Sequence, residues 1–450
     1  MPVTELDRQK GETAHFYPQV LPGSQAVLFT TFAGGILADA NRANIEVLSF
    51  KTGERKTLVR GSRLGRYLPS GHLVYLHQNS LLAAAFDLDK LAIIGAPQAV
   101  LEDVSYISFT SPGDFDFAQT GIFVYISGKG EPPRSIFWLD SAGKTQPLHP
   151  AQGFYRNLRF SPDGKHLAFE TSDLADIWVQ NIERDTAVRL TSLPGTNGVP
   201  LWTPDGKYIV FLSSNQPNAG IYRTRADGSG EPQRLTERPT GGEVTGLPSS
   251  VSPDGKRLLV SSTGRGFGAN IWTAPIEGDP DHPRLGKAEP FLHTPAFASL
   301  PTFAMPEFSP DGRWMAFALG ETGRSEVYVK PFPGPGGRWR ISANGGGFPI
   351  WSPNGRELFF LSSDQRIMVV DYAAKGDSFA PGKPRVWSEK RILLREGGGP
   401  FQPYALAPDG KRFAVLLYPD GTVEQQRSTR LTFLLNFFDE LRRRVPVESK

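Results

Sequence analysis

The sequence contains no cysteine among its 450 residues. This absence excludes disulfides, thiolate metal sites, thiol nucleophiles and thiol-based redox switches. It leaves the compartment open, because a large domain folds without disulfides even in an oxidising environment.

Long apolar runs and an excess of one charge are also missing. The most apolar stretch, 431–438, is far shorter than a bilayer span, and no apolar core follows the first residues as in a secretory signal. We therefore expect no membrane insertion by this chain and, without an export signal, a cytoplasmic location by default. Its 49 basic and 46 acidic residues leave a net charge of +3, which gives no electrostatic reason to expect nucleic acid as a partner.

Glycine and proline are abundant instead, with 48 and 39 copies. Both disfavour helix interiors, and both mark turns. Hydrophobic residues make up 39% of the chain and aromatic residues 11%, which is enough for a large core and argues against disorder. The composition predicts an all-β protein.

One short motif recurs along the chain, in which Ser or Thr (Ala in the last copy) and then Pro-Asp-Gly (Pro-Asn-Gly in the fifth copy) precede a basic residue and an apolar run. Its prolines follow one another at intervals of 42 to 57 residues, the repeat length of four-stranded propeller blades. The six copies occupy 161–165, 203–207, 252–256, 309–313, 352–356 and 407–411.

Each copy predicts a hairpin between two strands. Proline presets the first corner of a turn, and Asp-Gly or Asn-Gly adopts the conformations that reverse the chain. We assign a structural turn role to Asp163, Gly164, Asp205, Gly206, Asp254, Gly255, Asp311, Gly312, Asn354, Gly355, Asp409 and Gly410.

Upstream of residue 150 the motif is degenerate, and three weaker copies lie near Pro22, Pro69 and Gly121. Six regular and three degenerate units make about nine blades of four antiparallel strands. Because single rings usually have four to eight blades, we expect a partial propeller of about three blades over 1–150 and a six-bladed ring over 151–450. One large eight- or nine-bladed ring over 1–450 is the alternative.

The last unit supplies only three strands, within 404–417 and 431–437, so closure of the ring requires a fourth strand from elsewhere in the chain. A fourth strand near Lys144–Leu148 would join the two ends of the six-bladed ring. Pairing of 3–6 with the C-terminal unit would instead close a single large ring.

The repeats resemble the TolB-type, WD40-like Pro-Asp propeller repeats of bacteria over nearly the whole chain. Three stretches, 11–23, 324–333 and 434–441, resemble the extracytoplasmic C-terminal propeller region of bacterial receptor-like serine/threonine kinases. This resemblance implies a sensor domain, a periplasmic or extracytoplasmic location, and earlier blades and a membrane helix upstream of this chain. No kinase loop is present, so any kinase activity would belong to a domain outside it.

Candidate chemistry is sparse. The seven histidines are scattered, and the Gly-x-Ser-x-Gly motif of a propeller-linked peptidase is absent. Glu243 and Glu307, near inner strands of regular blades, are the candidate channel residues for a carboxylate metal site, and salt-bridged or solvated carboxylates are the alternative. The basic residues of the turns would form a positive ring on one face, with simple solubility as the alternative. These residues are Lys165, Lys207, Lys256, Arg313, Arg356 and Lys411.

We expect a non-catalytic propeller that acts as a sensor or scaffold and binds a protein, peptide or glycan, with no cofactor and as a monomer or as part of a larger polypeptide. The alternative from another class is a metal-dependent, lactonase-like propeller hydrolase with its site at the central channel.

Overall fold

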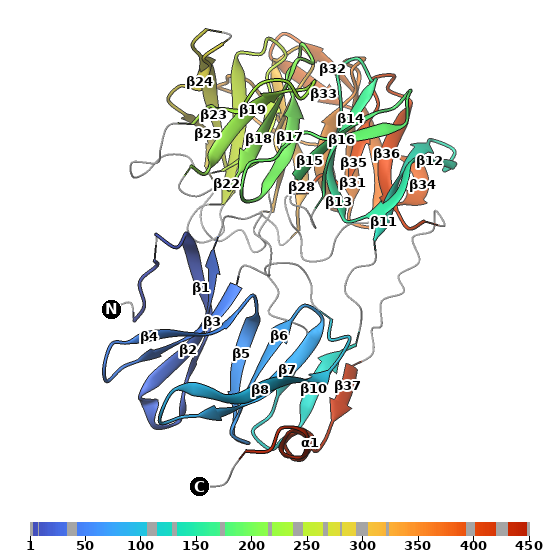
Figure 1. Ribbon diagram of the computed structural model, residues 1–450. Coiled ribbons are helices and arrows are strands. Elements are labelled where there is room, and N and C mark those ends of the chain that lie inside the picture. The colour runs from blue at the N-terminus through green and yellow to red at the C-terminus, as the bar shows by residue number, and fades with distance from the viewer. Residues whose placement is uncertain are drawn as a thin grey trace. The chain divides into compact units, whose positions relative to one another are not determined.

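A computed structural model describes most of the chain (Figure 1). The described residues are 3–7, 9–33, 43–105, 115–127, 133–171, 176–214, 218–236, 246–263, 269–279, 281–293, 305–320, 324–392, 401–419 and 431–447.

The chain divides into two compact units. Unit 1 comprises Met1–Pro132 and Glu424–Lys450, and unit 2 comprises Pro133–Val423. The boundary therefore precedes residue 150, and the C-terminal segment belongs to the unit that contains the N-terminus. Such a division is not visible in sequence order, because the last segment pairs with strands more than 300 residues upstream.

The described strands of unit 2 form six antiparallel sheets of four or five strands. We name the sheets A to F in ring order. Sheet A contains β11 (Arg134–Asp140), β12 (Thr145–Gly153), β35 (Tyr404–Leu406) and β36 (Arg412–Leu417). Sheet B contains β13 (Tyr155–Phe160), β14 (His166–Thr171), β15 (Asp176–Asn181) and β16 (Thr186–Arg189). Sheet C contains β17 (Asn197–Trp202), β18 (Tyr208–Ser213), β19 (Gly220–Arg225) and β20 (Gln233–Arg234).

The other three sheets follow the same plan, and two of them gain a fifth strand. Sheet D contains β21 (Leu247–Val251), β22 (Arg257–Thr263), β23 (Ala269–Glu277), β24 (Arg284–Leu285) and β25 (Glu289–His293). Sheet E contains β26 (Glu307–Phe308), β27 (Trp314–Leu319), β28 (Glu326–Pro331) and β29 (Trp339–Arg340). Sheet F contains β30 (Gly346–Trp351), β31 (Glu357–Ser362), β32 (Arg366–Lys375), β33 (Ser378–Pro381) and β34 (Arg385–Arg391).

Hydrophobic clusters between neighbouring sheets join the six sheets into a ring. Buried side chains of B and C, C and D, D and E, and E and F pack in successive clusters. Two further clusters join F to A and A to B, around Phe413 and Leu416 respectively. The six sheets therefore close on themselves without strands of unit 1.

Sheet A performs the closure. β11 pairs with β36 along Ser135–Asp140 and Arg412–Leu417, so strands from the two ends of unit 2 share one sheet (Figure 1, where the teal β11 lies beside the red-orange β36). The segment expected to supply a closing strand, Lys144–Leu148, lies largely in β12, which reaches the sheet through β11. Leu431–Leu434 takes no part in it and pairs in unit 1 instead.

The first strands of the sheets form the inner wall of the ring. β35, β13, β17, β21, β26 and β30 contact one another in this order, and the Tyr404 hydroxyl of β35 donates to the Phe348 carbonyl of β30 at 2.6 Å. Three of these strands carry a β-bulge at a residue with positive φ, which is rare outside glycine. These residues are Asn157, Val199 and Phe348.

The six motif copies form the turns after these inner strands. In the first, the Ser161 hydroxyl donates to Asp163 Oδ1 at 2.6 Å, and the same oxygen accepts the Lys165 N–H at 3.0 Å. These donors lower the pKa of the Asp163 carboxyl. All six turn glycines have φ between +66° and +72°, the region that glycine adopts without strain. The turns also touch: Gly164 faces Pro408, and Gly206 faces Pro162.

In three sheets, a side-chain hydroxyl accepts a hydrogen bond from a backbone N–H near the start of the third strand, and we call this contact the hydroxyl lock. The backbone N–H groups of Ile177, Ile221 and Val327 donate to hydroxyl oxygens at 3.0, 3.2 and 2.8 Å. The acceptors follow an Arg-Leu or Arg-Ile pair and are Thr191, Thr236 and Ser342. In sheets B and E the same hydroxyl donates to a buried carboxylate, Asp176 or Glu326.

Unit 1 contains three sheets among its described residues, and all three also show antiparallel pairing. The first contains β1 (Glu12–Val20), β2 (Ala26–Ala33), β3 (Ala43–Ser49) and β4 (Arg55–Arg60), with a short 3-10 helix, η1 (Pro22–Ser24), after β1. The second contains β5 (Arg63–Leu68), β6 (His72–His77), β7 (Ser80–Asp87) and β8 (Ala92–Leu101). The third contains β9 (Phe115–Phe117), β10 (Phe123–Ile126) and β37 (Leu431–Leu434).

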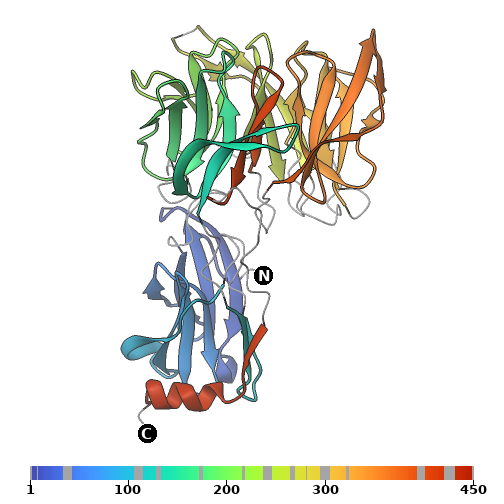
Figure 2. The same ribbon diagram turned by 90° about the vertical axis from the view of Figure 1, so that its right-hand side faces the viewer.

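One helix, α1 (Phe437–Arg444), completes the described part of unit 1 and lies beside its strands as the red coil in Figure 2. Phe437, Phe438 and Leu441 on one side of α1 are buried in the cluster between the second and third sheets. His72 Nε2 lies 2.7 Å from the Val445 carbonyl just beyond the helix. The C-terminal segment therefore contributes to the core of unit 1.

Candidate functional site

Two ionisable residues share one repeat position on the inner wall of unit 2. Arg159 in β13 and Glu307 in β26 each stand two residues before the motif Ser, where the other four sheets place Leu201, Ser250, Ile350 and Ala405. Sheets B and E are three steps apart in either direction around the ring. Arg159 and Glu307 therefore lie on opposite sides of its axis, and we call them the axial pair.

The backbone around the two residues follows the same design. The indole N–H of Trp202 donates to the Arg159 carbonyl at 3.0 Å, and the indole N–H of Trp351 donates to the Glu307 carbonyl at 3.1 Å. Each tryptophan belongs to the following sheet. The axial pair is thus held by equivalent bonds on opposite sides of the ring.

The Arg159 side chain has no hydrogen-bond or ion-pair partner among the described residues, although it is largely buried on an inner strand. Burial lowers the pKa of its guanidinium, and the charge of Glu307 opposes this effect. A bulge lies between Arg156 and Arg159 in the pairing of β13 with β14. Arg159 therefore presents a guanidinium with five donors and no described partner at a half-buried position of the inner wall.

The Glu307 carboxylate accepts one described hydrogen bond, from the Trp351 backbone N–H to Oε2 at 3.3 Å. Burial raises the pKa of this carboxyl to about 7, although the Arg159 charge and the Trp351 N–H act in the opposite direction. No ion pair within 4.0 Å joins Glu307 to Arg159 in the described part of the chain. The two charges therefore act on each other across a separation and are not in contact.

Tyr404 on β35 is the third ionisable group of this region. Its side chain is fully buried. Burial, and secondarily the Glu307 charge, raises the pKa of its phenol well above the usual range. Its hydroxyl already donates to Phe348, so Tyr404 supports the inner wall and stays neutral.

The other expected site residues contribute no cluster. Glu243 lies outside the described residues. Within the described ranges, no group of three or more His, Asp or Glu side chains could hold a metal ion. Of the expected carboxylate pair, the described residues therefore contain only Glu307. Its charge interacts with that of Arg159, a residue that the sequence analysis did not propose.

All six basic residues of the turns are exposed. Arg313 donates to the Gly376 carbonyl at 2.6 Å and lies 3.8 Å from Asp377. Five of the six turns also carry an aspartate two residues before the basic residue, so the charges of this face are mixed.

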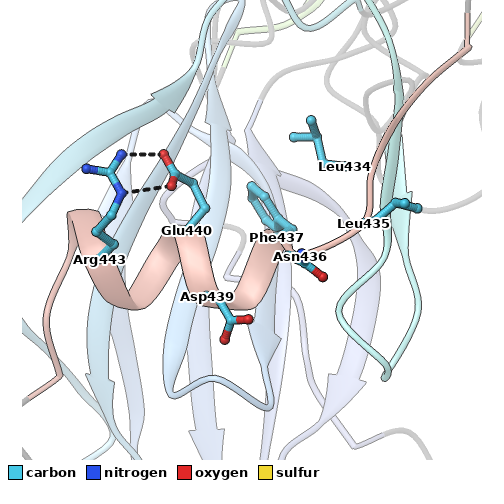
Figure 3. Close-up of a pocket in the computed structure, with 7 residues that line it drawn as sticks. All are labelled: Leu434, Leu435, Asn436, Phe437, Asp439, Glu440 and Arg443. Carbon is cyan, nitrogen blue, oxygen red and sulfur yellow. Dashed lines mark hydrogen bonds and ion pairs between the residues drawn. The ribbon is translucent and has the colours of Figure 1, made fainter.

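Unit 1 has a surface pocket at the junction of β37 and α1 (Figure 3). The Glu440 carboxylate in it pairs with Arg443 at 2.7 Å and Arg444 at 2.5 Å (Figure 3 shows the Arg443 pair). The charged side chains of its lining are therefore already paired within the helix. The residues that line it are Leu434, Leu435, Asn436, Phe437, Asp439, Glu440 and Arg443.

No described helix has both the length and the apolar character that a membrane crossing requires.

Sequence reasoning had one available signal for Arg159. Aligning the six motif copies places charged residues at the position two before Ser or Thr in only two of them. Their relation across the axis becomes visible only when the number of sheets in the ring is known.

Comparisons with known proteins agree with this fold. Residues 121–280 match the model of the TolB beta propeller domain. An uncharacterised protein of Agrobacterium fabrum is 26% identical over 308 residues, which cover 65% of this chain and 97% of that protein. The uncharacterised peptidase YuxL of Bacillus subtilis is 29% identical over 247 residues, 54% of this chain, but the match spans only 32% of YuxL.

Among solved structures, a TolB candidate protein of Agrobacterium tumefaciens has a TM-score of 0.46 and 21% identity, and the match covers 64% of this chain and 99% of that one. TolB from Acinetobacter baumannii has a TM-score of 0.36 and 20% identity, with 67% and 74% of the two chains covered. The matched repeats and the closed ring of antiparallel sheets show that this chain contains a TolB-like β-propeller domain.

Proposed function

We propose that the chain is a non-catalytic binding propeller, a sensor or scaffold, which holds an anionic group of a protein, peptide or glycan ligand on Arg159. The single observation behind this proposal is the Arg159 guanidinium, which lies on an inner strand with no partner among the described residues. An opposite charge nearby favours a half-buried guanidinium, and the planar guanidinium suits carboxylates and phosphates. A ligand anion would supply the missing partner.

The rest of the unit fits binding. Blades held by cores between all neighbouring sheets form a rigid frame, and rigid frames position binding groups well. Glu307 favours the guanidinium charge from across the axis without occupying its donors. Arg159 therefore remains available to a ligand.

The experiment is a thermal-shift screen of dicarboxylic acids, uronic-acid oligosaccharides and short acidic peptides against the full chain. We expect hits that raise the melting temperature of the wild type and that lose this effect in Arg159→Gln. Lys165→Gln, which removes an equal charge from an exposed turn of the same sheet, is the matched control and should keep the effect. Hits that remain unchanged in Arg159→Gln contradict the proposal, and turnover of a bound compound would favour the hydrolase alternative.

A further inference from the structure

The two residues of the axial pair have hydrogen-bonding groups without a described partner, donors on Arg159 and acceptors on Glu307. Arg159 offers donors with no described partner, whereas Glu307 uses one of its acceptor sites for the Trp351 N–H. Both side chains retain partial solvent exposure although they lie on inner strands. A purely structural ion pair would bring the two groups into contact, and these two are not within 4.0 Å of each other.

A simple anion or cation would neutralise only one of the two charges of the axial pair. A bound anion would neutralise Arg159 and place a second negative charge opposite Glu307. A bound cation would neutralise Glu307 and face the Arg159 charge. Like charges brought together in a region of low dielectric destabilise a complex, so neither simple ion is the best match.

A molecule with both charges satisfies both groups. Resting on the proposed function, and naming its ligand class, we propose that the axial pair binds a zwitterion, an amino acid or short peptide with free ends. Its carboxylate lies on the Arg159 guanidinium and its ammonium group at the Glu307 carboxylate. Both contacts are charge-assisted hydrogen bonds, which are stronger than neutral ones.

The surroundings of Glu307 connect this binding to proton release. Strands β21, β27 and β30, which contact β26, carry no ionisable side chain. Among the described residues, Arg159 and Tyr404 are the charged or titratable groups that interact electrostatically with Glu307. Because the pKa of Glu307 is about 7, part of the population is protonated at neutral pH. An ammonium group beside it favours the carboxylate, and binding therefore releases a proton.

The probes are glycine, diglycine, triglycine and tetraglycine, each also with an acetylated amino end or an amidated carboxyl end, titrated calorimetrically into the full chain at pH 7. We expect one length to bind the wild type with free ends at least about tenfold more tightly than either capped form. In Arg159→Gln the amidated and free forms should bind equally, and in Glu307→Gln the acetylated and free forms should bind equally. Lys165→Gln should behave as the wild type.

Repeating the titration in buffers of different ionisation enthalpy measures the released proton, a readout that a merely structural role of Glu307 would not produce. Equal binding of the acetylated and free forms by the wild type overturns the zwitterion and leaves anion binding at Arg159 in place. Failure of every oligoglycine to bind also overturns it, whereas the proposed function fails only when the anionic probes above bind independently of Arg159.

Discussion

Arg159 and Glu307 occupy equivalent positions on the inner strands of opposite sheets, and each is followed in the next sheet by a tryptophan that donates to its carbonyl. No ion pair joins them in the described chain, so their charges interact across the axis of the ring. Ionisable side chains with strongly shifted pKa values, such as Glu307, cluster at functional sites.

Glu307 should make unit 2 less stable as pH rises. Burial raises the pKa of its carboxyl from 4.5 to about 7 in the folded state. Between these values the unfolded chain loses its proton first, so the free energy of unfolding falls by up to about 3 kcal/mol between pH 4.5 and 7. Glu307→Gln should remove this decrease. All eight tryptophans lie within unit 2, so urea unfolding at several pH values can be followed by tryptophan fluorescence.

Other carboxyl groups also titrate in this range, and the quantity to compare is the difference between the wild type and Glu307→Gln. Glu289→Gln, an exposed carboxylate in sheet D, is the control. A wild-type curve parallel to that of Glu307→Gln at all pH values would show that the carboxyl titrates normally.

Glu170 should be one of the most sensitive positions of the frame. Its fully buried carboxylate accepts bonds from Arg156 Nε at 2.5 Å, Asn157 Nδ2 at 2.8 Å and the Val199 N–H at 3.1 Å. Glu170→Ala leaves the Arg156 charge buried without its partner, so we expect a loss of about 3–5 kcal/mol. The measurement is the urea midpoint by tryptophan fluorescence.

Asp227→Asn is the control for Glu170, because Asp227 is an exposed carboxylate paired with Arg225 at 2.7 Å. Exposed pairs contribute little to stability, and we expect no measurable change. Equal midpoints for the two variants would mean that Glu170 does not connect sheets B and C.

The hydroxyl lock should contribute through hydrogen bonds. Thr191→Val preserves the shape of the side chain but removes the acceptor of the Ile177 N–H and a donor to Asp176. We expect a loss of about 1–3 kcal/mol in the same unfolding experiment. Thr186→Val, at an exposed position of β16, should change stability little. If the Thr191→Val protein is as stable as this control, the hydroxyl lock does not contribute to the stability of unit 2.

Leu441 tests the division into two units. Its side chain is fully buried between the second and third sheets of unit 1. Leu441→Ala should cost about 2–5 kcal/mol in unit 1, lowering one calorimetric transition while the tryptophan signal of unit 2 stays in place. Leu435→Ala, at a side chain that is 66% exposed, is the control. An equal downward shift of the tryptophan transition would show that the units unfold as one.

Much of the propeller was predictable from local sequence. The six turns were predictable because Pro-Asp-Gly favours a chain reversal. The glycine of this motif adopts the positive φ that such a turn requires, as Gly164 does. The strands follow from the apolar runs on either side of each turn. The sequence predicts strands that end at residues such as Thr191, but it does not predict the hydroxyl lock. That contact depends on the Asp176 carboxylate, which folding brings beside the Thr191 hydroxyl.

The missing cysteines and the repeated turns determined, from sequence alone, that packing between β-blades stabilises this protein. Both are local properties of composition and spacing. Tertiary structure alone decided that β11 closes the ring with β36, that the C-terminal segment belongs to unit 1, and that Arg159 and Glu307 lie on opposite sides of the ring axis. These relationships depend on how many sheets fit around one axis, which is set by packing between residues hundreds of positions apart.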